Sequence, residues 1–219
     1  MAANVSDRAA AEAAARQAGV AVSRETQDRL VLYVSLLRRW NPVKNLVSPH
    51  TLSAVWERHI ADCLQLAALA PDARTWVDLG SGGGLPGLVI AAVLAERAGT
   101  RIHLVESKLG KAAFLREAAR QMGVPATIHA FRIEGVLAQW TEPVDVVTAR
   151  ALAPLDQLVR LSVPLLKTGA FGLFPKGQDV GSELTQAAKY WKLDTVLTPS
   201  VTEQDGRIVT VRRAEPVAS

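Results

Sequence analysis

The sequence predicts an α/β fold, in which a mostly parallel β-sheet covered by helices follows a separate helical segment. After residue 74, short apolar runs alternate with helical patterns, as they do where helices connect parallel strands. Glycine-rich residues 80–84 separate the first apolar run from the next helical pattern. The preceding residues show helical patterns only. We therefore expect an N-terminal helical cap over residues 1–72 and an α/β domain over residues 73–219.

The composition is that of a globular protein. The chain has 219 residues, 49% hydrophobic and 21% charged, which excludes a disordered chain and allows one domain with a small appendage. The best apolar run, residues 85–95, is much shorter than the roughly 20 residues of a spanning helix. Asp7, Arg8 and Glu12 stand where a signal peptide would be apolar. We expect a cytoplasmic protein with no membrane partner.

Cysteine and histidine usage argues against a metal site. The single cysteine, Cys63, excludes an internal disulfide and a thiolate zinc site. We expect no metal, because the histidines show no ligand spacing. The net charge of +4 is spread along the chain, so it is compatible with a nucleic-acid partner without requiring one. The histidines are His50, His59, His103 and His129.

The cap is expected to contain three helices. The first is Ala-rich with interspersed charges, a composition that favours helix. Ser23 is the expected N-cap of the second, which carries apolar residues at helical spacing. Asn41-Pro42 is expected to end this second helix. The three predicted helices are residues 6–17, 23–40 and 52–69.

The remaining chain alternates strands and helices until its last two strands. These two have no helix between them, so we expect an antiparallel hairpin at the sheet. The expected strands are residues 75–79, 101–105, 126–130, 144–148, 170–174, 193–197 and 207–212. The expected helices are residues 85–97, 108–122, 134–140, 155–166 and 179–191.

The sharpest motif is DLGSGGGLPG, which begins at Asp78 where the first strand meets the first helix. Glycines at such a junction let the backbone turn tightly and approach a ligand closely. Gly82, Gly84 and Gly87 satisfy the dinucleotide pattern G-x-G-x-x-G. Gly80, Gly82 and Gly84, preceded by Asp78, satisfy the acid-x-G-x-G-x-G pattern of S-adenosylmethionine loops.

The position of the acid separates these two interpretations. In a dinucleotide site the first glycine should follow the strand at once, but Gly82 comes later and Asp78 ends the strand. A carboxylate there suits an ammonium group and a sulfonium, and it would repel a pyrophosphate. Glu106, at the end of the second strand, can accept both hydroxyls of a ribose in either site. We favour S-adenosylmethionine, with a nicotinamide-dependent oxidoreductase as the less favoured alternative.

The same stretch, with Leu-Pro-Gly after the glycines, resembles the bacterial 16S ribosomal RNA guanine-N7 methyltransferases, originally called glucose-inhibited division protein B. Further segments resemble that family's motifs in the same order, and the similarity covers about residues 25–215. Cys63 and Ser48 stand where the family usually has serine and threonine. The further segments are Trp40-Asn41 with Asn45-Leu46-Val47, Arg58-His59 with Asp62, Lys111 with Phe114-Leu115, Thr148-Ala149-Arg150-Ala151, and Pro175-Lys176-Gly177.

The resemblance implies a Rossmann-like class I methyltransferase fold with a seven-stranded sheet, and S-adenosyl-L-methionine as cofactor. It implies the small ribosomal subunit or its 16S rRNA as partner, and we expect a monomer. A methyltransferase acting on another substrate is the alternative. The glycine-loop argument contributes Asp78, Gly82, Gly84 and Glu106 as cofactor-binding residues. The resemblance adds Gly80, Leu85, Ile133, Glu134 and Arg150.

RNA contacts need hydrogen-bond donors near the glycine loop. Lys176 and Arg150 lie at the carboxyl ends of predicted strands, where either could meet guanine oxygen 6 or a phosphate. Arg58, His59 and Asn45 could reach the same rim from the cap. Guanine N7 carries a lone pair and no hydrogen, so it can attack a methyl group without a general base. We therefore assign no residue as a catalytic acid or base.

Overall fold

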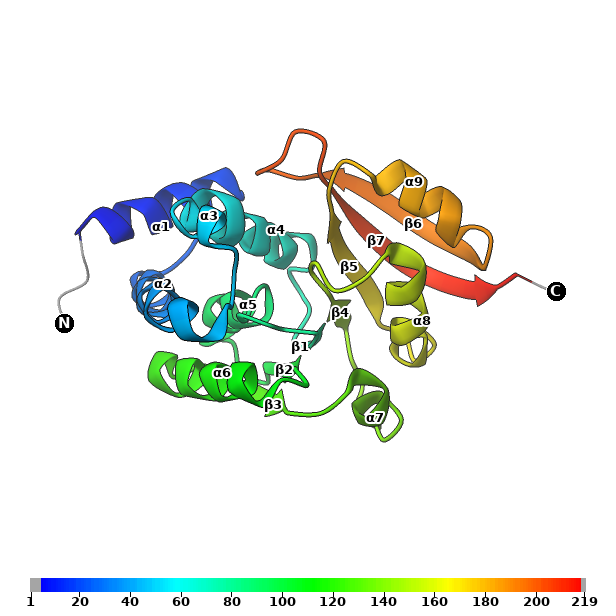
Figure 1. The fold of residues 1–219 in the computed structure, drawn as a ribbon, viewed down its shortest axis with the longest axis horizontal. Coiled ribbons are helices and arrows are strands. Elements are labelled where there is room, and N and C mark those ends of the chain that lie inside the picture. Colours follow the sequence, from blue (N-terminus) through cyan, green and yellow to red (C-terminus); the bar gives the residue numbers. More distant parts are fainter. Residues whose placement is uncertain (1–4, 218–219) are drawn as a thin grey trace.

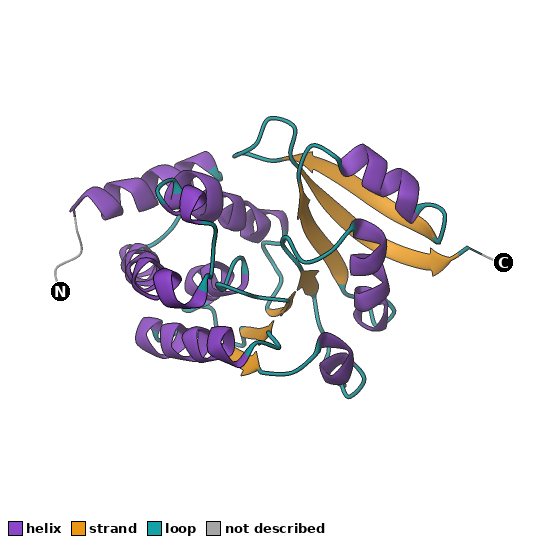
Figure 2. Ribbon diagram, in the orientation of Figure 1, coloured by secondary structure: helices purple, strands orange, loops and turns teal. Residues whose placement is uncertain are grey.

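A seven-stranded sheet forms the centre of the structure, a computed structural model that describes residues 5–217 (Figures 1 and 2). Its strand order is β3-β2-β1-β4-β5-β7-β6. Strands β1 to β5 pair in parallel, whereas β7 runs antiparallel to both β5 and β6. The predicted sheet with an antiparallel closing pair is confirmed. The strands are β1 (Thr75–Leu79), β2 (Arg101–Val105), β3 (Ala126–His129), β4 (Val146–Thr148), β5 (Phe171–Lys176), β6 (Trp191–Pro199) and β7 (Arg207–Pro216).

Helices pack on both faces of this sheet (Figure 1). Among the described helices, none combines the length and the apolar character needed to cross a bilayer. The N-terminal helices are α1 (Val5–Gln17), α2 (Arg24–Lys44), α3 (Pro49–Leu52), the π-helix η1 (Trp56–Ile60) and α4 (Ala61–Leu69). The later helices are α5 (Gly87–Leu94), α6 (Leu109–Met122), α7 (Ile133–Leu137), α8 (Leu155–Leu166) and α9 (Val180–Ala187).

The N-terminal helices share a hydrophobic core with helices of the α/β part. Ala11 of α1 and Leu37 of α2 belong to the same buried cluster as Leu88 of α5 and Phe114 of α6. The opposite face of the sheet has its own core, beneath α7, α8 and α9. The helical segment is therefore packed onto one face of the sheet, and the domain boundary at residues 72 and 73 stays a prediction.

Helix α2 does not end at Asn41-Pro42, contrary to the sequence prediction. It continues to Lys44 and stops at Asn45, whose φ of 48° is left-handed. The buried side chain of Asn41 explains the extension, because its Oδ1 accepts hydrogen bonds from the backbone N–H groups of Leu46 and Val47, each at 2.9 Å. These bonds stabilise the chain just beyond the helix despite the proline inside it.

Several other element boundaries also differ from the prediction, and two helices differ most clearly. The helix expected over residues 52–69 is divided into α3, η1 and α4, and η1 contains Arg58 and His59. Single π-turns of this kind are frequent at functional sites. The helix expected over residues 179–191 ends at Ala187, because Trp191 instead pairs with Pro216 in the β6–β7 ladder.

Gly87, the first residue of α5, provides a test of close packing beside the glycine loop. A Cβ there would overlap Leu104 Cδ2 and lie 2.8 Å from Asp78 Oδ2. We expect Gly87→Ala to lower the free energy of unfolding by about 1–3 kcal/mol through overpacking. Gly181→Ala in α9 is the control, because nothing lies within 4 Å of its added Cβ. Denaturant unfolding measures both, and equal stabilities would contradict the packing argument.

Candidate functional site

The glycine-rich loop between β1 and α5 is held by neighbouring backbone and side chains. The N–H of Ser81 donates to Val105 O at 3.0 Å, and the N–H of Gly84 donates to Ser81 O at 2.7 Å. The fully buried Tyr33 of α2 donates its hydroxyl hydrogen to Gly83 O at 2.6 Å. The cap therefore contacts the loop directly, and Tyr33 is a residue that the sequence analysis missed within an amphipathic helix.

The three alternating glycines of the loop have different surroundings, although all have positive φ. A Cβ on Gly80 would lie 2.6 Å from Leu152 Cδ1, and a Cβ on Gly84 would lie 2.5 Å from Leu88 Cδ1. At Gly82 the nearest atom would be Gly80 O at 3.7 Å. Gly84 therefore serves the packing of α5, whereas Gly82 faces open space.

Asp78, which the sequence predicts as a cofactor-binding residue, is buried beneath the start of α5. Side chains alternate along a strand, and Val77 and Leu79 face the α7–α9 core, so Asp78 points to the other face beneath α5. Its Oδ2 accepts from the N–H of Gly87 at 3.2 Å and its Oδ1 from the Thr148 hydroxyl at 3.1 Å.

Asp78 is 1% exposed and lines none of the cavities around the loop, and burial raises the pKa of its carboxyl to about 7. Its hydrogen bonds therefore position the loop, and its contact with the cofactor stays a prediction.

Glu106 stands at the end of β2, as predicted, and lines a cavity. Its Oε2 accepts from the N–H of Gly82 at 3.0 Å, and its Oε1 from the N–H of Lys108 at 2.7 Å. The cavity, here called the Glu106 cavity, has a volume of about 460 Å³. Predicted residues that line it are Gly80, Gly82, Glu106, Ile133 and Glu134.

A second cavity of about 380 Å³, the Leu85 cavity, lies on the other side of the loop. Leu85, Arg150 and His59 line it. Ala151 and Lys111 line both cavities, together with Gly80 and Gly82. The glycine loop is thus bordered by two adjoining spaces, which together can hold a ligand of nucleoside size with an extended arm.

Arg150 is anchored to the N-terminal helices. Its Nη2 donates to His59 Nδ1 at 2.7 Å and to Arg58 O at 3.2 Å, and its Nε lies 3.4 Å from Asp62 Oδ2. Because an arginine only donates, His59 Nδ1 is the acceptor and its Nε2–H donates to Thr51 Oγ1 at 2.8 Å. Burial, with Arg150 and Arg58 adding repulsion, lowers the pKa of His59 to about 4.

The adjacent Cys63 is no nucleophile, because burial raises its pKa to about 12 and leaves it a neutral thiol.

The predicted RNA-binding residues are only partly brought together. Lys176 is 9% exposed in its side chain, and its Nζ contacts Glu183 Oε2 at 2.7 Å and Ala153 O at 2.8 Å. Arg58 pairs with Glu203 at 2.9 Å. Asn45 is the exposed C-cap of α2 and lines neither the Glu106 cavity nor the Leu85 cavity. Only part of the expected basic rim is therefore free for RNA.

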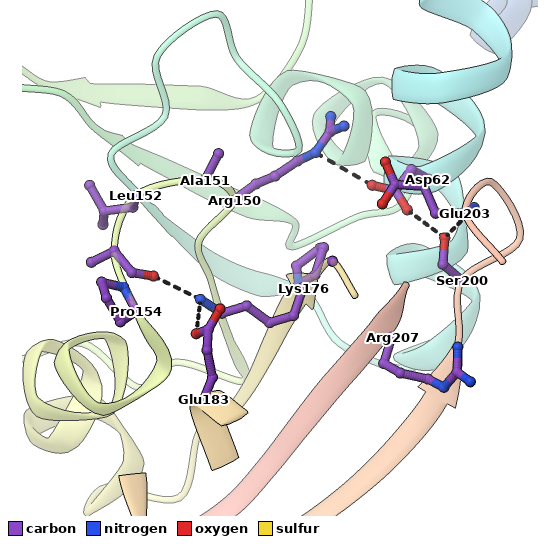
Figure 3. A pocket seen from close by; sticks show the side chains of 13 residues that line it. Asp62, Arg150, Ala151, Leu152, Pro154, Lys176, Glu183, Ser200, Glu203 and Arg207 are labelled. Atoms are coloured by element: carbon purple, nitrogen blue, oxygen red, sulfur yellow. Dashed lines mark hydrogen bonds and ion pairs between the residues drawn. The ribbon is translucent and has the colours of Figure 1, made fainter. Parts of the chain in front are cut away.

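Lys176 and Arg150 border a third cavity of about 500 Å³, here called the Lys176 cavity (Figure 3). It lies at the carboxyl ends of β4 and β5 and carries charges of both signs. Ala151 lines this cavity as well as the other two, so all three meet at this residue. The charged residues lining it are Asp62, Arg150, Lys176, Glu183, Glu203 and Arg207.

Solved structures share this fold. The chain matches the O-methyltransferase from Bacillus cereus in complex with SAH with a TM-score of 0.56 and 16% identity, covering 82% of this chain and 90% of that one. It matches the O-methyltransferase TomG from Streptomyces achromogenes with a TM-score of 0.53 and 14% identity, covering 87% and 90%. The fold, with its glycine loop after β1 and Glu106 after β2, is the class I methyltransferase fold.

Sequence comparison identifies the family within that class. The family model GidB, rRNA small subunit methyltransferase G, matches residues 26–209. The ribosomal RNA small subunit methyltransferase G of a Bradyrhizobium species is 54% identical over 202 residues, covering 92% of this chain and 91% of the relative. That of Methylobacterium radiotolerans is 56% identical over 194 residues, covering 89% and 91%. The chain belongs to the rRNA small subunit methyltransferase G family.

The lowered pKa of His59 predicts a pH-dependent stability. The unfolded chain takes up this proton near pH 6.5 and the folded chain only near pH 4, so stability from neutral His59 is present above pH 6.5 and lost as the pH falls toward 4. We expect His59→Asn, which cannot take up that proton, to show a flatter decline of thermal midpoint over this interval. His103, whose pKa burial also lowers to about 4, is unchanged in both proteins and cancels. Parallel curves would refute the assignment.

Proposed function

We propose that this enzyme transfers the methyl group of S-adenosylmethionine to N7 of one guanine in small-subunit 16S rRNA by direct in-line attack. The observation that carries the proposal is the meeting of three cavities at Ala151. Two of these cavities border the glycine loop and suit the cofactor, and the third is polar and suits a nucleotide. Family membership supports the same substrate.

The Glu106 cavity is proposed to hold the adenosine part of the cofactor. Each oxygen of the Glu106 carboxylate accepts one backbone N–H, and a carboxylate has about four lone-pair sites, so both oxygens can still accept from ribose hydroxyls. Ile133 and Glu134 begin α7 on the opposite side of this cavity, where we place the adenine. Gly82 lines both cavities, and the absence of a side chain there leaves room for a ligand that extends from one to the other.

The Leu85 cavity is proposed to hold the methionine end. Leu85 supplies an apolar contact, and Arg150 supplies a guanidinium that His59 and Arg58 O hold in place. The bound cofactor supplies an electrophilic methyl carbon on a sulfonium. Arg150 also borders the Lys176 cavity, so the same side chain is proposed to contact both the cofactor and the RNA.

The proposed reaction requires the protein to position the two reactants. Guanine N7 attacks with its own lone pair, so no side chain has to remove a proton. Holding the reacting groups in a near-attack arrangement can contribute roughly 7–11 kcal/mol. The methylated guanine is cationic. The Lys176 cavity is lined by the carboxylates of Asp62 and Glu203 as well as by Arg150 and Arg207, and these carboxylates can stabilise the positive charge.

We infer that the enzyme acts as a monomer on the small ribosomal subunit or its 16S rRNA. Arg150 and Lys176, with Arg58 and His59 from the cap, are the proposed contacts on the RNA side, and Asn45 is proposed to lie at the periphery of the RNA. This substrate places the reaction in the cytoplasm.

Methyl transfer itself is the first test. Small subunits from a strain that lacks the gene should accept tritium from labelled S-adenosylmethionine, and mass spectrometry of the digested rRNA should detect 7-methylguanosine. Subunits from the parent strain, already methylated, are the control and should accept little label. Label in ribosomal protein, or in another base, would contradict the proposal.

Gly82→Val tests the cofactor site. The added side chain has open space and would project between the two cavities. We expect affinity for S-adenosylhomocysteine to fall at least about 100-fold, or ~2.7 kcal/mol, while the protein stays folded. Gly123→Val is the matched control, because it also has a left-handed φ but lines neither cavity. Equal affinities of the two variants in calorimetry would disprove this role for Gly82.

A further inference from the structure

We propose that Glu183 is the specificity-determining residue of the methyl acceptor site, and that with Lys176 it binds the Watson–Crick edge of the target guanine in the Lys176 cavity. This inference rests on the proposed function and names the residues that would select the base. No family motif or sequence pattern pointed to Glu183, which lies in α9, 33 residues beyond Arg150.

The position of the Lys176 cavity qualifies it as the acceptor site. Ala151 is the point where it meets both cofactor cavities, so a base placed there adjoins the methyl donor. Ala151 has a φ of 51°, in the left-handed region that residues other than glycine rarely adopt. Such strain is concentrated at functional sites. A volume of about 500 Å³ accommodates a nucleoside.

The hydrogen-bonding groups of this pair match guanine. Lys176 Nζ carries three hydrogens and contacts Ala153 O and Glu183, which leaves one to donate. Glu183 Oε2 accepts from Lys176 and from the N–H of Leu155 at 2.7 Å, whereas no interaction involves its Oε1 within residues 5–217. A free donor therefore lies beside a free carboxylate acceptor (Figure 3).

Guanine presents the complementary groups, an acceptor at O6 beside donors at N1 and N2. Adenine presents an amino donor where guanine has O6, and this donor would face the Lys176 ammonium, which also donates. The unprotonated N1 of adenine is an acceptor and would face the Glu183 carboxylate, which also accepts. Sites built to hydrogen-bond a substrate group discriminate strongly against analogues that lack it, because their own polar groups are left unpaired.

This arrangement also points the nucleophile in the right direction. N7 lies across the ring system from N1 and N2, so a base held by Glu183 turns N7 away from this carboxylate. In Figure 3, Lys176 and Glu183 lie together on one side of the cavity and Ala151 lies on another. Neither proposed contact uses the N7 lone pair, which stays free for attack. The anionic Glu183 also favours the positive charge that methylation gives the base.

The test must separate base recognition from the structural role of Glu183 at the start of α8. Glu183→Gln is suitable, because the amide oxygen can still accept from the N–H of Leu155. The substrates are small subunits reconstituted with 16S rRNA that carries either guanosine or inosine at the methylated nucleotide. Inosine lacks only the N2 amino group. Glu215→Gln, at an exposed position of β7, is the matched control.

We expect the wild type to methylate guanosine about 5- to 150-fold better than inosine in kcat/KM, the effect of one acceptor that the bound base covers and leaves unpaired. Glu183→Gln should lower kcat/KM on guanosine and reduce the guanosine-to-inosine ratio several-fold, with unchanged affinity for S-adenosylhomocysteine. The Glu215→Gln control should keep the wild-type ratio.

A Glu183→Gln variant with a lower rate but an unchanged ratio would show a structural role and overturn the proposal. Equal rates of the wild type on both substrates would overturn it without any variant, even if Glu183→Gln failed to fold. A wild type that binds S-adenosylhomocysteine yet methylates no guanine would overturn the proposed function, and this inference with it.

Discussion

The hydrogen bonds of the buried Asp78 carboxylate connect the parts of the site that have to stay in register. One oxygen accepts from Gly87 at the start of α5, and the other accepts from Thr148 at the end of β4. The glycine loop connects Asp78 to Gly87, so this hydrogen bond joins its two ends. The loop that carries Arg150 and Ala151 follows Thr148 directly. A carboxyl beneath a helix N-terminus is favourably placed, and its burial raises the pKa to about 7. The geometry of the loops on both sides of the Glu106 and Leu85 cavities therefore depends on one side chain that lines neither of them.

The N-terminal helices complete the site from the opposite direction. Tyr33 donates a hydrogen bond to the glycine loop, and His59 and Asp62 interact with the Arg150 guanidinium. The π-turn places Arg58 O and the His59 ring toward the same guanidinium. A cation fixed by this many partners loses little conformational freedom when it meets a ligand, so it is suited to orienting reactants. The three cavities therefore meet at Ala151, next to an arginine whose side chain has several fixed partners.

Several features followed from local sequence alone. Strands β1 and β2 and helix α8 lie where their apolar patterns predict them, and Glu106 lies at the cavity as expected. Burial patterns and turn-forming residues act over a few positions, so they can be read without knowing the rest of the chain. The glycine loop belongs to the same group, because its chemistry and its place after a strand are both local properties.

Only the tertiary structure decided which polar groups pair. The Asp78 carboxyl accepts a hydrogen bond at the start of α5, and Lys176 pairs with Glu183. Helix α2 continues past Pro42 because the Asn41 side chain binds the backbone beyond it. Arg150 donates a hydrogen bond to His59, which lies 91 positions earlier in the sequence. A side chain can be assigned a type of chemistry from its sequence context, but its partner is chosen by packing between distant segments. Many of the residues that line the cavities were therefore foreseeable in sequence, their roles in binding stay predictions, and their contacts depended on how the sheet and the helices fold together.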